Sequence, residues 1–214
     1  MPTHCLFAGE RPVWWEMQPP AVSVLVVDDH PALRAGLEQL LDQEAGYRLL
    51  GAVSSEAELA GALQRHRPDV VVMDYALTRG DGLSACFRLK QRPHPPGVVL
   101  YSAYVDDVFA VPATVAQADA IVSNNDPVEV LLTAIDAVAA GDSQVPSPDP
   151  ELIEAASARL DAEDLPVVGM LFARVRVGDI ATTLGVEPRE VEARALRIIG
   201  EMQAHDPRHG HAAV

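Results

Sequence analysis

Short apolar runs alternate with segments of helical periodicity between residues 21 and 141. Each run is rich in Val, Ile and Leu and is bounded by turn residues, as in parallel strands that are buried on both faces. The predicted strands are Val22–Val27, Arg48–Val53, Asp69–Met73, Gly97–Tyr101 and Ala120–Val122. The predicted helices are Pro31–Glu44, Ser55–His66, Leu83–Arg92, Val108–Gln117 and Pro127–Ala140. This alternation predicts right-handed crossovers and a doubly wound, five-stranded parallel α/β domain with the flavodoxin-like order 2-1-3-4-5.

Local signals refine the ends of these helices. Pro31 suits the first turn of a helix, where a missing backbone N–H is tolerated. Ser54–Ser55 followed by Glu58 has the spacing of a capping box. Pro112 interrupts the fourth helical segment, so this helix is expected to be short or kinked.

The pattern changes after Gly141. Residues 142–150 (DSQVPSPDP) have no hydrophobic period and are rich in Pro and Ser, which predicts a linker. Three or four short helices are expected after it, at Glu151–Leu160, Glu163–Val175, Gly178–Leu184 and Pro188–Gln203. The sequence thus predicts a small all-α domain over residues 151–204. Residues 1–20 are interpreted as an N-terminal extension and residues 205–214 as a disordered tail.

Composition narrows the class of protein. The 214 residues carry a formal net charge of −15, which argues against a surface coated for nucleic acid, so any DNA contact must come from a local patch. Cys5 and Cys86 show neither metal-ligand spacing nor a disulfide framework, which favours a reducing cytoplasm. No apolar run approaches the roughly 18 residues of a membrane span, and residues 1–20 lack a signal-peptide core. A cytoplasmic protein without membrane contact is expected.

Three carboxylates follow two strands that are neighbours in the predicted sheet. Asp28 and Asp29 come directly after the first strand, and Asp74 comes directly after the third. At the carboxyl edge of the sheet they would converge, and a divalent cation such as Mg²⁺ would relieve their repulsion. A carboxylate there is also a possible nucleophile toward phosphorus. The alternative is that the aspartates are only helix caps and loop residues, and His30 is open to either a ligand or a structural role.

Four segments resemble the receiver domain of NarL/FixJ-type response regulators. They are VVDDHPALRAGLEQLL, PDVVVMDYALTRGDGL, VVLYSA and ADAIVSNNDPVEVLLTAIDAVAAG, and the resemblance runs from Val22 to Gly141. It implies that Asp74 is the phosphoacceptor and that Ser102 carries the switch hydroxyl. The implied magnesium ligands are Asp28, Asp29, Asp74 and the backbone carbonyl of Ala76. The implied partners are a sensor histidine kinase and a second copy of the chain.

The sequence departs from the family at the position of its lysine. Asn124 stands there, and Lys90, the only lysine in the chain, belongs to the third predicted helix, away from the carboxylates. Thr78 replaces the usual proline, and Ile121 occupies the position of the aromatic switch residue. These changes predict weak, atypical or absent phosphorylation. The alternative is that the Asn124 amide substitutes for the lysine and the protein works with slower kinetics.

The segment DIATTLGVEPREVEARALRII resembles the LuxR-type helix-turn-helix, with an apolar stripe at Val191, Ala195, Ile198 and Met202. Arg189, Arg194 and Arg197 are the candidate DNA contacts. Glu190 and Glu192 share their helix, and the spacings Glu190–Arg194 and Arg197–Glu201 suit ion pairs along an exposed face. A helical bundle without DNA function is the alternative.

The leading hypothesis is a two-component response regulator whose phospho-aspartate receiver controls a DNA-binding output domain. The alternative is a pseudo-receiver that acts through protein partners without phosphorylation or DNA binding. An enzyme is not expected. A haloacid-dehalogenase-like phosphatase would need an aspartate two residues after Asp28, where His30 stands, and no Gly-rich phosphate loop or zinc spacing is present.

Overall fold

The protein is described by a computed structural model over residues 20–77, 80–103 and 105–204. The strands are β1 (Val22–Val27), β2 (Tyr47–Val53), β3 (Val70–Met73), β4 (Gly97–Ser102) and β5 (Ala120–Ser123). The helices of the first domain are α1 (Pro31–Gln43), α2 (Glu56–Arg65), α3 (Gly82–Lys90), α4 (Ala110–Val115) and α5 (Val128–Ala139). The helices of the second domain are α6 (Pro150–Ser157), α7 (Leu165–Phe172), α8 (Val177–Leu184) and α9 (Pro188–Ala204).

The sheet has the order β2-β1-β3-β4-β5, and all neighbouring strands are parallel. This confirms the predicted flavodoxin-like, doubly wound domain. β4 and β5 each run one residue further than predicted, because Ser102 and Ser123 pair at their carboxyl ends. β2 begins one residue earlier than predicted, at Tyr47, which pairs with Val22.

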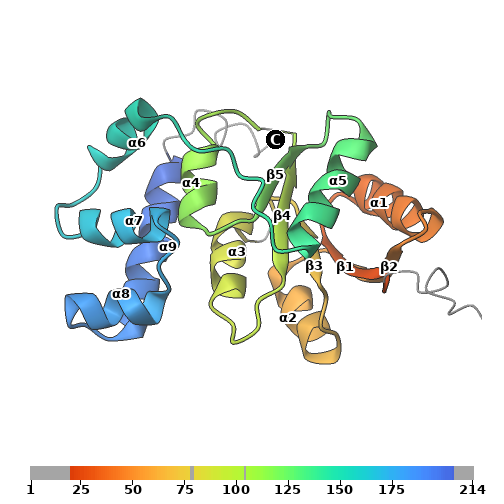
Figure 1. The fold of residues 1–214 in the computed structure, drawn as a ribbon, viewed down its shortest axis with the longest axis horizontal. Helices are drawn as coiled ribbons and strands as arrows, with labels where there is room; N and C mark the ends of the chain where they lie inside the picture. Colours follow the sequence, from red (N-terminus) through yellow and green to blue (C-terminus); the bar gives the residue numbers. More distant parts are fainter. Residues whose placement is uncertain (1–19, 78–79, 104, 205–214) are drawn as a thin grey trace, which may run out of the picture.

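Helices cover both faces of the sheet (Figure 1). On one face, Leu37 of α1 and Ile135 of α5 belong to a core with the side chains of β1, β3, β4 and β5 that point to them. On the other face, α2, α3 and α4 enclose a second core that contains Leu25 and Phe87. Because strands buried on both faces need apolar side chains at every position, they appear in the sequence as continuous Val-rich runs.

α4 is short, as Pro112 predicted. Pro112 is the third residue of this helix, where no intrahelical N–H bond is lost, so the proline is tolerated. The chain leaves the helix at Ala116, and Gln117 takes a left-handed conformation with φ 62°. The helix therefore covers only the middle of the segment Val108–Gln117.

The second domain is helical, as predicted. α6 begins at Pro150, one residue inside the predicted linker, because the Asp149 side chain accepts a hydrogen bond from the Glu151 N–H at 2.8 Å. α7 is shorter than predicted because the chain reverses at Arg174, which has φ 53°. On α9 the predicted stripe is buried except for Met202, which is partly buried, and Ile199 is buried in addition. Residues 1–19 of the predicted extension, and residues 205–214, lie outside the described residues.

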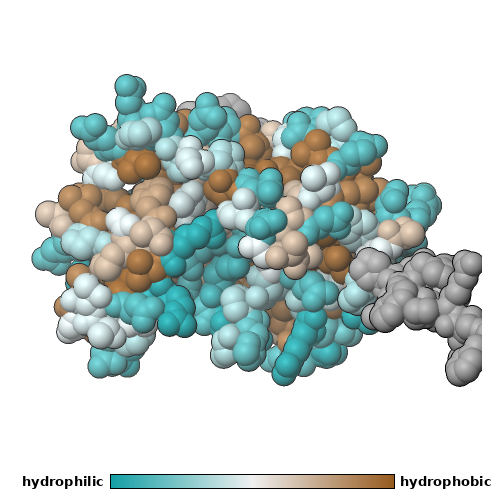
Figure 2. Space-filling view, in the orientation of Figure 1, coloured by the Kyte–Doolittle hydropathy of each residue, from teal (hydrophilic) through white to brown (hydrophobic). Residues whose placement is uncertain are grey.

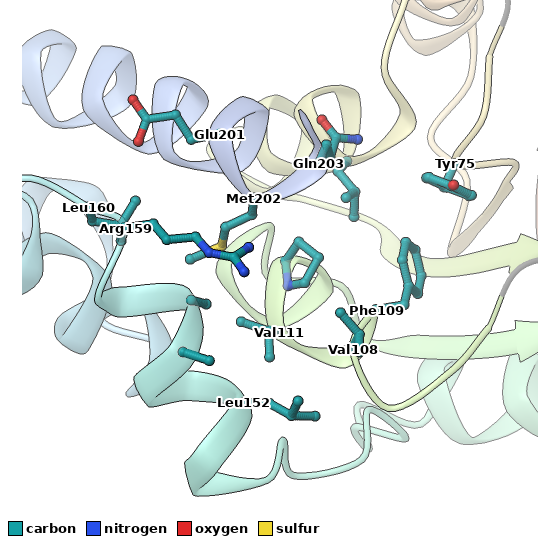
Figure 3. A pocket seen from close by; sticks show the side chains of 14 residues that line it. Tyr75, Val108, Phe109, Val111, Leu152, Arg159, Leu160, Glu201, Met202 and Gln203 are labelled. Carbon is teal, nitrogen blue, oxygen red and sulfur yellow. The ribbon is translucent and has the colours of Figure 1, made fainter. Parts of the chain in front are cut away.

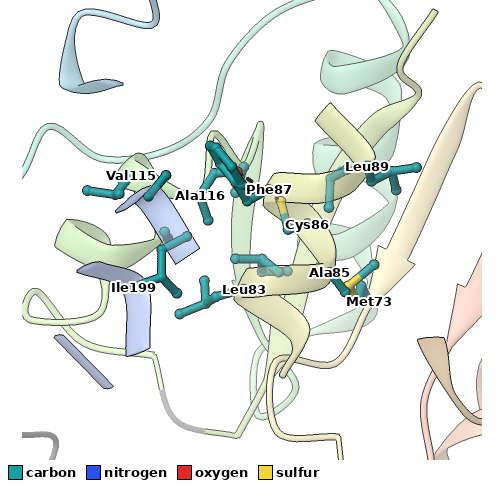
Figure 4. Packing of buried hydrophobic residues seen from close by; sticks show 14 of the residues in the cluster. Met73, Leu83, Ala85, Cys86, Phe87, Leu89, Val115, Ala116 and Ile199 are labelled. Carbon is teal, nitrogen blue, oxygen red and sulfur yellow. Dashed lines mark hydrogen bonds between the residues drawn. The ribbon is translucent and has the colours of Figure 1, made fainter. Parts of the chain in front are cut away.

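The two domains share one apolar core. Figure 4 shows Ile199 of α9 beside Leu83 of α3 and Val115 of α4, and all three side chains are buried. Polar contacts add to this packing. Gln203 Nε2 donates to Asp81 Oδ1 at 2.6 Å, and Arg174 Nη2 donates to the Ala118 carbonyl at 2.7 Å. The carboxyl half of α9 is thus packed against the first domain.

The surface carries both hydrophilic and hydrophobic regions (Figure 2). Figure 2 shows hydrophilic residues along the lower edge of the first domain, around α2 and α3 (labelled in Figure 1), and hydrophobic residues reaching the surface around α6 and α7. Among the described helices, none is both long and apolar enough to cross a membrane.

Candidate functional site: an acidic pocket at the carboxyl edge of the sheet

Two adjacent strands deliver the acidic side chains. Val27, the last residue of β1, pairs with Met73, the last residue of β3. The next residues, Asp28 and Asp74, therefore lie side by side, and the Asp74 N–H donates to the Val27 carbonyl at 2.8 Å. The order of the strands thus brings together the carboxylates that the sequence separates by more than forty residues.

His30 completes this cluster. Its Nδ1 lies 3.4 Å from Asp28 Oδ1 and 3.0 Å from Asp29 Oδ1. The same nitrogen lies 3.7 Å from Asp74 Oδ2. One potential ligand atom from each of the four residues falls within 4.8 Å of the others. The His30 side chain is 66% exposed, whereas Asp28 and Asp74 are buried, so the imidazole lies at the mouth of an otherwise enclosed acidic pocket.

Backbone groups hold two of the carboxylates. Asp28 Oδ1 accepts a hydrogen bond from the His30 N–H at 2.7 Å, and Asp74 Oδ1 accepts one from the Ala76 N–H at 3.1 Å. Asp28 Oδ2 is buried and has no hydrogen-bond partner within the described part of the chain. A buried carboxylate oxygen without a donor is unfavourable, and a hard divalent cation among carboxylate oxygens would satisfy it. The donor set therefore fits Mg²⁺.

Burial dominates the electrostatics of this pocket. Loss of solvent raises the pKa of the Asp74 carboxyl to about 6, against the Ala76 hydrogen bond that lowers it. The neighbouring Asp28 charge raises the pKa of Asp74 further. Burial also raises the pKa of Asp28, and the hydrogen bond from the His30 backbone opposes that rise. Negative charge in the pocket thus lowers the stability of the folded chain, and a bound cation would offset this loss.

The remaining described positions implied by the resemblance lie on β4 and β5 or directly after β5. Ser102 ends β4 and is buried, and the Asn124 N–H donates to its carbonyl at 2.9 Å. Since β4 pairs with β3, Ser102 and Asn124 lie at the same edge of the sheet as Asp74. Ile121 is partly buried and packs against the core on the α2–α4 face. Thr78 lies outside the described residues.

Lys90 does not reach this edge. Its Nζ lies 2.7 Å from Asp119 Oδ2 and 3.4 Å from the Pro96 carbonyl, next to the first residues of β4 and β5. The lysine is therefore paired at the amino edge of the sheet, and the acidic pocket lies at the opposite edge.

Sequence reasoning missed Arg34. On α1, Arg34 Nη1 donates to the Asp28 carbonyl at 2.6 Å, which ties the helix to the loop after β1. The position of Arg34 in the first turns after the acidic pair was the available signal, but periodicity alone does not show where a long side chain turns.

The candidate DNA-contacting arginines of α9 differ in whether their side chains are already bonded to carboxylates. Arg189 is exposed. Arg194 Nη2 donates to Glu190 Oε1 at 2.7 Å, as the spacing predicted. Arg197 Nη2 bonds both carboxylate oxygens of Asp164, at 2.8 and 2.6 Å, and Asp164 is buried. Two of the three arginines are thus engaged within the domain.

Comparison with known proteins agrees with the fold. The family model of the response regulator receiver domain matches residues 24–136. The chain therefore belongs to the response regulator receiver family. It is a two-component response regulator that is similar to NarL-type regulators along most of its length, with a receiver followed by a helical second domain.

Individual relatives extend over both domains. The chain is 24% identical to the response regulator UvrY of Escherichia coli over 196 residues, which are 86% of this chain and 89% of that protein. It is 25% identical to the probable transcriptional regulatory protein NarL of Mycobacterium tuberculosis over 202 residues, or 88% and 91% of the two chains.

Solved structures of response regulators are similar to this chain in fold. A LuxR-family response regulator from Aurantimonas superimposes with a TM-score of 0.56 at 25% identity, over 65% of this chain and 99% of that chain. RcsB of Salmonella typhimurium superimposes with a TM-score of 0.55 at 18% identity, over 89% of this chain and 96% of that chain, which supports the fold alone.

Proposed function

We propose that Asp74 accepts a phosphoryl group from a sensor histidine kinase and that the state of the receiver controls binding of promoter DNA by the output domain. The observation that carries the proposal is the pocket of Asp28, Asp29 and Asp74, with a buried oxygen of Asp28 that lacks a partner among the described residues. If the aspartates served only to form structural ion pairs and hydrogen bonds, we would expect this buried oxygen to have a hydrogen-bond donor.

Magnesium is the cofactor that this pocket suits. Its ligands would be carboxylate oxygens of Asp28, Asp29 and Asp74 together with the Ala76 carbonyl, since Mg²⁺ prefers oxygen and keeps some of its water. When bound, the ion supplies positive charge that stabilises the phosphoryl group during transfer.

The reaction itself requires one nucleophile. A carboxylate oxygen of Asp74 attacks phosphorus while the bond from phosphorus to the kinase histidine nitrogen breaks, and the electron pair leaves with that imidazole. The Ala76 N–H, which bonds Asp74 Oδ1, would keep the carboxylate oriented. The Ser102 hydroxyl, on the adjacent strand, would donate a hydrogen bond to the phosphoryl oxygens of the product.

Asn124 is the residue that is expected to weaken phosphoryl transfer in this receiver. A neutral amide in place of the ammonium group removes a charge-assisted contact of about 1.5–3 kcal/mol. Phosphoryl transfer or the activated state should therefore be weaker than in a receiver with the lysine.

Binding of beryllofluoride tests the pocket directly. With Mg²⁺ present, the full chain should give a bound fluorine signal in ¹⁹F NMR that disappears in Asp74→Asn and in Asp28→Asn. Asp42→Asn, at an exposed position of α1, should keep the signal. If the unaltered chain gives no magnesium-dependent signal, the phosphoreceiver proposal is wrong.

The output domain is proposed to bind DNA as a dimer. RcsB of Salmonella has been solved bound to a promoter in the presence of a phosphomimetic, RcsB has also been solved as dimers bound to DNA, and this chain shares the RcsB fold. In this chain α8 and α9 form the helix-turn-helix, and Arg189 is exposed and available to a phosphate.

A pseudo-receiver that binds a protein partner is the second candidate. Asn124 favours it, and so does the engagement of Arg194 and Arg197 by Glu190 and Asp164, because arginines that are already paired neutralise fewer phosphates.

Fluorescence polarisation with mixed promoter DNA across a salt series separates the two candidates. If the chain binds DNA, Arg189→Ala should weaken binding to all sequences alike and lower the salt slope by about one. Arg48→Ala, at an exposed position of β2, should not. Absence of salt-dependent binding, with and without beryllofluoride, would support the protein partner.

A further inference from the structure

A cavity of about 310 Å³ lies between the receiver and the output domain (Figure 3). The receiver contributes α4 and the residues after β3, and the output domain contributes α6 and the end of α9. Protein interiors rarely leave voids much larger than a water molecule, whereas small-molecule sites begin at about 300 Å³. This cavity is therefore large enough for a ligand.

The walls of the cavity are mainly apolar. Val111 of α4 faces Leu152 of α6, and Met202 of α9 closes one side (Figure 3). Pro112 of α4 also lines the cavity. Val108 lies at the receiver side and is 50% exposed, so solvent reaches the site. A hydrocarbon group placed here would leave water for apolar surroundings, which is favourable in proportion to the area buried.

One cation reaches into this apolar space. Among the described lining residues, Arg159 is the only arginine or lysine, and Figure 3 shows its guanidinium extended toward the cavity. The Arg159 N–H donates to the Ala156 carbonyl at 3.3 Å, but the guanidinium has no hydrogen-bond or ion-pair partner within the described part of the chain. Glu201 also borders the site, but its carboxylate points away and lies 3.9 Å from Arg197 Nε. The local charge is therefore positive.

We propose that this cavity binds a small amphipathic carboxylate, with its carboxylate on Arg159 and its hydrocarbon part between α4 and α6. An unpaired guanidinium beside apolar walls matches a ligand with one anionic end and an apolar body. A neutral ligand would leave Arg159 without an anion, and a cavity of about 310 Å³ suits a small molecule better than a folded partner.

The ligand would connect the two domains. It would contact Leu152 of the output domain, Val111 of the receiver and Tyr75, the residue directly after Asp74. A molecule that binds only where these surfaces meet stabilises their packed arrangement. The site would give this regulator a chemical input in addition to phosphorylation, and it does not depend on whether Asp74 is phosphorylated.

Calorimetric titration of the full chain with three ten-carbon probes tests the head group. Decanoate should bind at least about tenfold more tightly than decanol or decylammonium, because only the carboxylate forms a charge-assisted bond with Arg159. Among hexanoate, octanoate and decanoate, affinity should rise about fourfold for each methylene until the cavity is filled. Equal affinity for the three head groups, or no binding, would overturn the proposal.

Two variants locate the binding. Arg159→Gln, at an exposed position, should lower decanoate affinity about tenfold and remove its preference over decanol. Arg65→Gln, also exposed on a helix, should leave affinity unchanged. Ala156→Phe should fill the cavity and abolish binding. Decanoate binding that survives Arg159→Gln at full strength contradicts the site, and this comparison decides even if Ala156→Phe does not fold.

Discussion

At the scale of single residues, the charged carboxylates of the acidic pocket lower the stability of the folded chain, because they are buried. The folded-state pKa of Asp74, about 6, lies above its ordinary value of 3.8. Protonation of Asp74 therefore favours the folded chain. This contribution is complete below pH 3.8 and is lost as the pH rises to about 6.

Asp74→Asn is accordingly expected to stabilise the metal-free chain at pH 7, on the order of 1–3 kcal/mol, because it removes the buried charge. The gain should vanish near pH 4 and shrink when Mg²⁺ is added, since the ion offsets the same charge. Urea unfolding at the two pH values measures it. The exposed Asp42→Asn should change little, and an Asp74→Asn chain less stable at pH 7 would contradict this electrostatic account.

Asn124→Lys tests the departure from the family pattern. Because an ammonium group restores the charge-assisted contact to the phosphoryl group, phosphorylation by acetyl phosphate should become at least about tenfold faster. Asn125→Lys is the matched control, since the Asn125 side chain instead donates to the Ala103 carbonyl. Equal rates for both variants would show that position 124 does not approach the phosphoryl group.

At the scale of elements, the sequence predicted most of the receiver because its signals are local. Buried parallel strands require continuous apolar runs. The predicted cap of α2 forms in part as a capping box, since Ser55 Oγ accepts from the Glu58 N–H at 3.3 Å, but Glu58 Oε2 accepts from the N–H of Ser54, the residue before the cap, at 2.8 Å. The end of α7 was missed, because the left-handed Arg174 that ends it is stabilised by contacts with Ala118 and Ser143 of the receiver and linker.

Asp81 joins two elements. Its carboxylate caps α3 by accepting from the Leu83 and Ser84 N–H groups at 3.0 and 3.2 Å, and it accepts from Gln203 of α9. Asp81→Ala should therefore lower the free energy of unfolding by about 1 kcal/mol more than Gln203→Ala, which removes only the contact between domains. Urea unfolding of both variants measures this difference. Equal losses would mean that the cap contributes nothing.

At the scale of the whole molecule, packing between the domains was not predictable from the sequence. Ile199 was left out of the predicted stripe because its partners, Leu83 and Val115, belong to the other domain. The bond of Arg197 to Asp164 likewise joins residues 33 positions apart, whereas helical spacing reveals only neighbours within the same helix. Contacts of this kind depend on how the elements are arranged, which periodicity does not contain.

The shared core has a measurable consequence. Ile199→Ala should destabilise the chain by about 2–5 kcal/mol and reduce hydrogen-exchange protection in α3 as well as in α9. Val130→Ala, on the exposed face of α5 with 42% exposure, should change stability by less than about 0.5 kcal/mol. Loss of protection confined to α9 would show that the two domains are stabilised independently.

The central claim is that Asp74 accepts a phosphoryl group although Asn124 replaces the lysine. Intact-mass spectrometry after incubation with Mg²⁺ and acetyl phosphate tests it most directly, with Asp74→Asn as the comparison. We expect the unaltered chain to gain the mass of one phosphoryl group slowly, and Asp74→Asn to gain none. No gain in either chain would contradict the claim and identify a pseudo-receiver, and an equal gain in both would place the modification on another residue.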